Sequence, residues 1–191
     1  MDDSRPIGLT GSIAGGKSTV LTMLAGMGLR TASSDAVARE IFNEKFIQES
    51  LAERLETQAP VASGALRGAM LLDPGLRRWI NRLMHPLVGE RVARLDAEVI
   101  EVPLLFEACL QNRYREVWTV ACGPEERARR LRARYGPEAD LEALEAWQLP
   151  ERVKIGLGDR LIRTDQPSEA VQRVLTAEVT RCFPSWIALP K

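Results

Sequence analysis

Cysteine, histidine and net charge are all scarce in this sequence. Its 191 residues include 3 cysteines and 1 histidine, and 26 basic side chains balance 26 acidic ones. The widely spaced Cys109, Cys122 and Cys182 supply neither a disulfide framework nor a metal cluster, so we expect a reducing, cytoplasmic location. A net charge of zero gives no general attraction to nucleic acid or to a membrane surface, and we predict neither as a partner.

Long apolar runs are also missing. No run approaches the roughly 18 residues that a membrane helix needs, and residues 1–6 are acidic and polar, unlike a signal peptide. The hydrophobic content of 45% is ordinary for a globular protein. The composition therefore excludes a secreted mini-protein, a membrane protein, a collagen and a disordered chain, and the length predicts one domain over 1–191.

Short apolar runs alternate with longer amphipathic ones, which is typical of an α/β fold with a parallel sheet flanked by helices. We predict strands at residues 7–10, 29–32, 99–102, 116–121 and 160–163. Helices are predicted at 16–27, 124–135, 139–147, 151–157 and 168–181. Residues 36–96 have a helical pattern with no obvious strand, interrupted at 60–64 and 73–75, and this block is predicted to be an inserted lobe.

The most specific motif lies between the first predicted strand and the first predicted helix. Residues 11–18, Gly-Ser-Ile-Ala-Gly-Gly-Lys-Ser, match the phosphate-binding loop G-x-x-x-x-G-K-[ST]. Backbone N–H groups of such a loop surround a β-phosphate, and the following helix adds its positive end. We predict that Lys17 reaches the β- and γ-phosphates and that Ser18 offers its hydroxyl to Mg²⁺. The predicted nucleotide-binding residues are Gly11, Ser12, Ile13, Ala14, Gly15, Gly16, Lys17, Ser18 and Thr19.

A phosphate-binding loop occurs in kinases, GTPases and motor proteins, and the rest of the sequence distinguishes among these classes. The chain has no N-K-x-D motif for guanine, and it lacks the length and the Asp-Glu strand end typical of motors. A small-molecule kinase is therefore favoured. Asp35 follows the second predicted strand, where parallel strands converge on one crevice, and is the candidate base for the acceptor hydroxyl. The alternative is that Asp35 only caps its helix.

Arginine far outnumbers lysine, and arginines are concentrated in the helix predicted at 124–135. Arg127, Arg130 and Arg134 share one face of it, as a lid closing over a triphosphate would need. The alternatives are a solvated face paired with Glu125 and Glu126, a base-rich coding bias, or an RNA-binding strip. The acids at the two ends of residues 98–107 are candidates for water-mediated Mg²⁺ binding or for a substrate contact, and the alternative is a core strand with exposed acids. Read alone, His85 is a partly buried helix-end residue.

Several motifs together resemble the dephospho-coenzyme A kinase family. In order, they are the loop in residues 7–18, Asp-Ala-Val-Ala-Arg at 35–39, His-Pro-Leu at 85–87 and Val-Pro-Leu-Leu-Phe-Glu at 102–107. Gln148, Lys154 and residues 159–162 resemble the stretch that follows the family's lid. The resemblance covers about residues 7–165, and its Pro-Leu-Leu-Phe-Glu stretch is far more specific than the loop.

The resemblance implies transfer of the γ-phosphate of ATP to the ribose 3′-hydroxyl of dephospho-coenzyme A, the last step of coenzyme A synthesis. It implies a P-loop sheet, a substrate lobe at about 36–96 and a lid at about 124–157. Asp35 becomes the expected catalytic base, with Asp35, Arg39, His85 and Glu107 at the substrate. Either Arg130 or Arg134 is expected on the phosphates, beside the catalytic Lys17.

The chain also departs from the family pattern. Ser33-Ser34-Asp35 stands where the family often has Asp-Ala-Asp, and Gly68 stands where it usually has arginine. The stretch at 72–75 is short, and Arg163-Thr164 replaces the usual acid and asparagine near the adenine. These positions bear on substrate affinity and adenine selectivity. Two other hypotheses therefore stand: a P-loop kinase for a nucleoside or another small alcohol, and a nucleotide-binding relative with degenerate activity.

Overall fold

The computed structural model describes residues 4–138 and 148–184. Two compact units make up the chain. The first contains the residues up to Ser33 and those from Asp96 onward, and the second is Ser34–Leu95.

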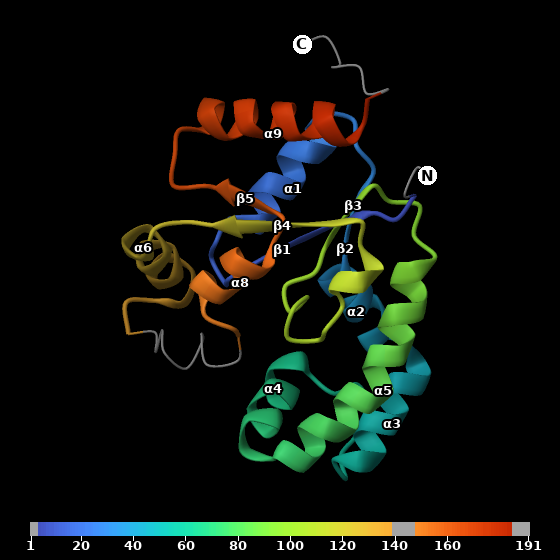
Figure 1. Ribbon diagram of the computed structural model, residues 1–191. Coiled ribbons are helices and arrows are strands. Elements are labelled where there is room, and N and C mark those ends of the chain that lie inside the picture. Colours follow the sequence, from blue (N-terminus) through green and yellow to red (C-terminus); the bar gives the residue numbers. More distant parts are fainter. Residues whose placement is uncertain (1–3, 139–147, 185–191) are drawn as a thin grey trace. The chain divides into compact units, whose positions relative to one another are not determined.

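The first unit is built on a five-stranded parallel sheet in the order β2-β3-β1-β4-β5 (Figure 1). The strands are β1 (Ile7–Gly11), β2 (Thr31–Ser33), β3 (Val99–Glu101), β4 (Glu116–Ala121) and β5 (Arg160–Arg163). All five predicted strands are confirmed, although β2 begins two residues later than predicted. The central β1 pairs with β3 on one side and with β4 on the other, so the residues that follow it lie in the middle of the sheet's carboxyl edge.

Helices α1 (Lys17–Gly26) and α9 (Ser168–Cys182) cover one face of this sheet (Figure 1). Ile7 and Leu9 of β1 point into the core that these helices form, since alternate strand residues face the same side. Val20 and Leu24 of α1 and Leu175 of α9 are fully buried there. Burial of this apolar face is the main contribution that holds the two helices on the sheet.

The opposite face explains why β1 contains a glycine. A Cβ atom on Gly8 would lie 2.7 Å from Leu105 Cδ1 and 2.9 Å from Tyr114 Cγ. Both side chains belong to the connection after β3, which includes the short 3-10 helix η1 (Gln111–Arg113) and packs directly on the strand. Burial raises the pKa of Tyr114. Helix α8 (Glu151–Leu157) lies on the same face, where Thr119 Oγ1 donates to the Lys154 carbonyl.

Between β4 and α8 the chain forms helix α6 (Pro124–Tyr135). The helix begins with a proline, as the sequence predicts. Its first turn contains Glu125 and Glu126, whose negative charges are favourable at the positive end of the helix dipole. Gly136, with φ of 96°, ends it as predicted. The helix predicted at 139–147 lies outside the described residues.

The second unit consists of helices α2 (Ser34–Phe42), α3 (Lys45–Arg54), α4 (Ser63–Leu72) and α5 (Pro74–Ala93). It contains no strand, as the helical pattern predicts. Ile41, Ile47, Leu51 and Ile80 form its buried core. Asp73 caps α5, because its Oδ1 accepts hydrogen bonds from Gly75 N at 2.7 Å and from Leu76 N at 3.0 Å. Within the described ranges, no helix is long and apolar enough to cross a membrane.

Candidate active site

The phosphate-binding loop connects the end of β1 to the start of α1, as the motif predicts. Two of its glycines are required by geometry. Gly11 has φ of 150°, and a Cβ there would lie 2.1 Å from the Val120 carbonyl oxygen of β4. Gly16 has φ of 96°, in the left-handed region that favours glycine. The loop therefore packs tightly against the sheet.

Lys17 is held against this loop. Its Nζ donates hydrogen bonds to the carbonyl oxygens of Gly11 at 2.9 Å and Ser12 at 3.0 Å. Only 8% of the residue is exposed. A buried ammonium group hydrogen-bonded to the loop backbone places a positive charge beside the position that phosphates would take.

Ser18 lies in the first turn of α1 and is exposed. Its hydroxyl makes no hydrogen bond within residues 4–138 and 148–184. That hydroxyl is the kind of hard oxygen ligand that Mg²⁺ prefers, so the residue present fits the ion. In the same described ranges there is no group of three or more His, Cys, Asp or Glu side chains that could hold a metal. P-loop enzymes hold much of their Mg²⁺ through phosphate oxygens, so such a group is not required.

Of the arginines on α6, Arg130 contacts the phosphate loop. Its Nη1 lies 3.4 Å from the Ala14 carbonyl oxygen and 3.0 Å from Thr164 Oγ1, and its Nη2 donates to the Thr164 carbonyl at 2.8 Å. Its Nε donates to Glu126 Oε1 at 2.7 Å. Hydrogen bonds from Arg129 and Arg130 lower the pKa of Glu126 to about 2. The ionised Glu126 thus orients Arg130 from the helix side.

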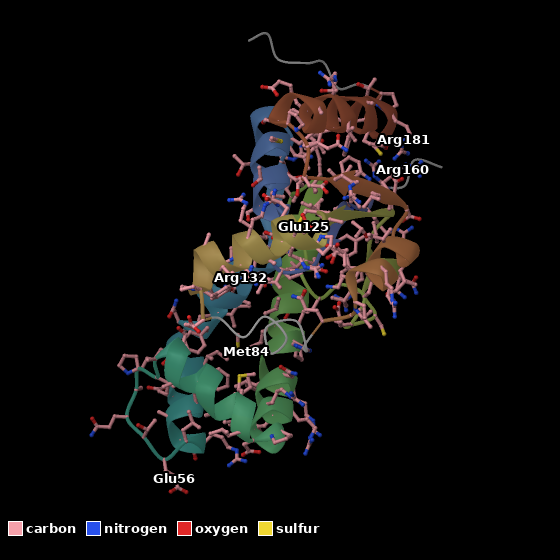
Figure 2. All side chains as sticks on the ribbon, turned by 90° about the vertical axis from the view of Figure 1, so that its left-hand side faces the viewer. Glu56, Met84, Glu125, Arg132, Arg160 and Arg181 are labelled. Carbon is pink, nitrogen blue, oxygen red and sulfur yellow. The ribbon has the colours of Figure 1, made fainter. Side chains whose placement is uncertain are left out.

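The other arginines of α6 have different surroundings. Arg127 pairs with Glu151 of α8 at 3.2 Å, and both side chains are largely buried. The Arg134 guanidinium lies 5.3 Å from the ring centre of Tyr135 and is exposed. Arg132 is exposed on the same helix (Figure 2). The three arginines predicted to share one face therefore differ in their surroundings: Arg127 forms an ion pair, Arg130 contacts the loop and Arg134 is exposed to solvent.

Glu107, predicted at the substrate, is engaged with a buried lysine. Its Oε1 accepts from Lys154 Nζ at 2.8 Å and from Leu149 N at 2.8 Å. The Lys154 side chain is 0% exposed, and its Nζ also donates to the Pro103 carbonyl at 3.1 Å. One Glu107 oxygen thus holds both α8 and the residue that follows Gln148. A role for Glu107 at the substrate stays a prediction.

Asp35, Arg39 and His85 lie in the second unit, on the packed helices α2 and α5. All three are exposed, and within the described chain none of their side chains forms a hydrogen bond or an ion pair. Helix α2 begins at Ser34, so Asp35 occupies the first turn and does not cap the helix. The interpretation of His85 as a helix-end residue is wrong, because α5 continues through Pro86 to Ala93.

Asp35 and Arg39 are one helical turn apart and share a face of α2. Asp35 also follows the sheet closely in sequence. Ser33, the last residue of β2, is in register with Glu101 of β3, and Glu101 is in register with Leu9 of β1. Strand β2 therefore ends at the same carboxyl edge as the strand that leads into the phosphate loop.

Sequence analysis did not assign roles to two residues that contact the loop. Gln148 Oε1 accepts a hydrogen bond from Ile13 N at 2.9 Å, and Thr164 Oγ1 donates to the Gly15 carbonyl at 2.7 Å. Only the family resemblance singles out these positions: Gln148 matches the family pattern, and Thr164 departs from it. Gln148 lies just before α8 and Thr164 just after β5, and no local sequence pattern indicates that either residue contacts the loop.

Comparison with known proteins gives a consistent result. A protein-family model described as "Dephospho-CoA kinase" matches residues 5–169. The chain is 37% identical over 174 residues to a dephospho-CoA kinase of Synechococcus sp. (strain CC9605), covering 83% of this chain and 84% of that protein. It is 35% identical over 166 residues to that of Gloeobacter violaceus, covering 78% of this chain and 80% of that protein.

Solved structures share the fold. A protein from Thermus thermophilus has a TM-score of 0.74 at 29% identity, covering 93% of this chain and 98% of that one. The dephospho-CoA kinase from Campylobacter jejuni has a TM-score of 0.69 at 20% identity, with coverage of 95% and 98%. A shikimate kinase from Acinetobacter baumannii has a TM-score of 0.57 at 15% identity, with coverage of 96% of each chain. The P-loop kinase fold predicted from the sequence is thereby confirmed.

Proposed function

Because this chain belongs to the dephospho-CoA kinase family, we propose that it phosphorylates the 3′-hydroxyl of dephospho-CoA with the residues predicted for donor and acceptor. ATP is the phosphate donor of the family, and the reaction gives CoA and ADP. The observation that carries the proposal is the fixed pair of cations at the phosphate loop. Lys17 and Arg130 come from different elements, yet both bond to the loop backbone.

On the donor side, backbone N–H groups of the loop bind the β-phosphate, apart from those of Ile13 and Gly15, which donate to Gln148 Oε1 and to the Ser12 carbonyl. Lys17 bridges the β- and γ-phosphates. Arg130 neutralises charge on the transferring phosphoryl group, and Arg134 is the second candidate for that task. Ser18 would hold Mg²⁺, which when bound supplies further positive charge to the phosphates. Preorganised charges of this kind act without reorganisation at the moment of reaction.

On the acceptor side, Asp35 accepts the proton of the 3′-hydroxyl as its oxygen bonds to the γ-phosphorus. The bond from that phosphorus to the bridging oxygen breaks, and ADP leaves with the electron pair. Arg39, one turn from Asp35, together with His85 and Glu107, binds the remainder of dephospho-CoA. The helical unit at about 36–96 serves as the substrate lobe, and residues at about 124–157 serve as the lid.

The test is ADP release from Mg²⁺ and ATP with dephospho-CoA, adenosine or AMP as acceptor, combined with identification of the phosphorylated position. We expect strong stimulation by dephospho-CoA alone, with a 3′-phosphorylated product. Lys17→Ala should lower turnover at least about 10²–10³-fold, the loss typical of one charge-stabilising donor. Lys45→Ala is a matched control, because Lys45 is an exposed lysine that pairs with Glu49 on the surface of α3.

Two outcomes would favour the other hypotheses. Stimulation by a different acceptor would keep the kinase and replace the substrate. ATP binding without acceptor-dependent ADP release would identify a nucleotide-binding relative whose activity has degenerated. Unimpaired turnover by Lys17→Ala would remove the phosphate loop from the mechanism.

The partner we propose is thus a small molecule, with no nucleic acid or membrane. A cytoplasmic location is supported by the three cysteines, all of which are free thiols. Binding of RNA to α6 would instead give an affinity that falls steeply with added salt, which a titration with and without salt measures.

A further inference from the structure

Thr164 is the first residue after β5, at the carboxyl edge of the sheet. Its backbone N donates a hydrogen bond to the carbonyl of Ala121, the last residue of β4, at 2.9 Å. This bond continues the pairing of β4 with β5 by one residue and fixes the Thr164 backbone. The side chain is thereby placed beside the phosphate loop rather than left in a mobile turn.

The Thr164 hydroxyl joins the phosphate loop to Arg130. Oγ1 donates its single proton to the Gly15 carbonyl at 2.7 Å, which is shorter than its 3.5 Å distance to the Ala121 carbonyl. A hydroxyl keeps two lone pairs for accepting, and one of them receives Arg130 Nη1 at 3.0 Å. The Thr164 carbonyl receives Nη2 at 2.8 Å. One residue therefore binds both outer nitrogens of the guanidinium.

The contact with the loop is also steric. A Cβ atom on Gly16 would lie 2.7 Å from Thr164 Oγ1 and 3.0 Å from its Cγ2. Gly16 precedes Lys17 directly, so the threonine packs against the turn from which the catalytic lysine projects. Arg130 is only 26% exposed in this arrangement.

We propose that Thr164 is a positioning residue that fixes Arg130 against the phosphate loop for binding of the ATP phosphates. The proposal rests on the proposed role of Arg130. A long arginine side chain loses much rotamer freedom when it binds a ligand, and ordering it beforehand removes that cost from binding. Glu126 fixes the guanidinium at Nε, and Thr164 fixes it at the two outer nitrogens, so its plane is defined before ATP arrives.

The experiment compares three threonine variants by equilibrium binding of ATP and by turnover with dephospho-CoA. Thr164→Val keeps the shape and removes the hydroxyl, and we expect ATP affinity to fall about 10- to 100-fold, the factor for a hydrogen bond to a charged group. Thr164→Ser restores the hydroxyl and should bind ATP within about threefold of the parent. Thr176→Val is the matched control, because the Thr176 hydroxyl donates to the Gln172 carbonyl within its own helix, α9, in an exposed hydrogen bond.

The decisive comparison repeats Thr164→Val in an Arg130→Ala background. If the threonine acts through Arg130, the second substitution should change ATP affinity less than about twofold there. An equally large loss in that background would overturn the proposal, since the threonine would then act on the loop alone. The proposal would also be overturned if Thr164→Val left ATP affinity unchanged while Arg130→Ala lowered it. That result would still support the role of Arg130. If Arg130→Ala itself has no effect, the proposed role of Arg130 fails, and the positioning role fails with it.

Discussion

The two units of the molecule hold their candidate functional side chains in opposite ways. In the first unit, the side chains assigned to the phosphate donor, Lys17 and Arg130, are buried or half-buried, and each forms at least two hydrogen bonds to its surroundings. In the second unit, Asp35, Arg39 and His85 are exposed, and the described part of the chain offers their side chains no hydrogen bond.

This difference follows from what each side has to bind. A triphosphate is compact and highly charged, and rigid donors that are fixed in advance bind it with little entropic cost. A larger acceptor can orient exposed side chains as it binds. We therefore interpret Lys17 and Arg130 of the first unit as a preorganised donor site, and the exposed side chains of the second unit as an adaptable part of the acceptor site.

The largest effect expected from the second unit is on catalysis. Asp35→Asn removes the proposed proton acceptor and should lower kcat by about 10²–10⁴-fold, the range for loss of a general base. Affinity for ATP should change less than about twofold, because the donor contacts lie elsewhere. Steady-state kinetics and equilibrium ATP binding measure the two quantities separately. A fall in kcat below tenfold would assign Asp35 a structural role in the first turn of α2.

Breaking the buried pair in the first unit should affect stability. Lys154→Met leaves the Glu107 carboxylate without its cation in a largely buried site, and the free energy of unfolding should fall by about 3–5 kcal/mol. Adding Glu107→Leu removes the stranded charge and should recover part of that loss. Urea denaturation of the single and double variants gives both values. A loss under about 1 kcal/mol in Lys154→Met would show that this pair contributes little to the stability of the first unit.

A smaller effect is expected from the exposed cation near Asp35. Arg39→Ala should raise KM for dephospho-CoA about tenfold, as loss of one charge-assisted hydrogen bond does, with KM for ATP unchanged. His85→Ala should act in the same direction. Arg54→Ala, on α3, is a suitable control for the loss of an arginine from this unit. A rise in KM for ATP instead would contradict the division between donor and acceptor sides.

The smallest effect concerns acid stability. Hydrogen bonds from Arg129 and Arg130 lower the pKa of Glu126 from 4.5 to about 2 in the folded protein. Because the folded pKa lies below the unfolded one, these bonds stabilise the fold above pH 4.5, and their contribution is lost as the pH falls through about 2. A carboxyl titration followed by NMR should place the Glu126 midpoint near 2. In Glu126→Gln, the decline in stability over this acid range should be shallower than in the parent.

Strands, helices and the phosphate loop could be predicted from the sequence because each depends on local patterns. Apolar runs define β1 and β4, and proline followed by two glutamates defines the start of α6. The glycines of the loop carry their own signature, since few other residues adopt those backbone angles.

The long-range contacts of the first unit could not be predicted in the same way. Lys154 lies between Val153 and Ile155, where a solvated lysine is the ordinary expectation, and its burial depends on Glu107, 47 positions earlier in the chain. Thr164 reaches Gly15 across 149 positions, and Gln148 reaches Ile13 across 135. Such partners are brought together by the order of the strands, and a pattern within one segment does not contain that order.

The most direct test of the division between the two units is the dissociation constant for ATP, measured on two sets of variants in parallel. For Asp35→Asn, Arg39→Ala and His85→Ala, we expect values within about twofold of the parent. For Lys17→Ala and Arg130→Ala, we expect affinity to fall by tenfold or more. If a folded variant of the second unit weakened ATP binding as strongly as these two, the assignment of donor and acceptor sides would be wrong.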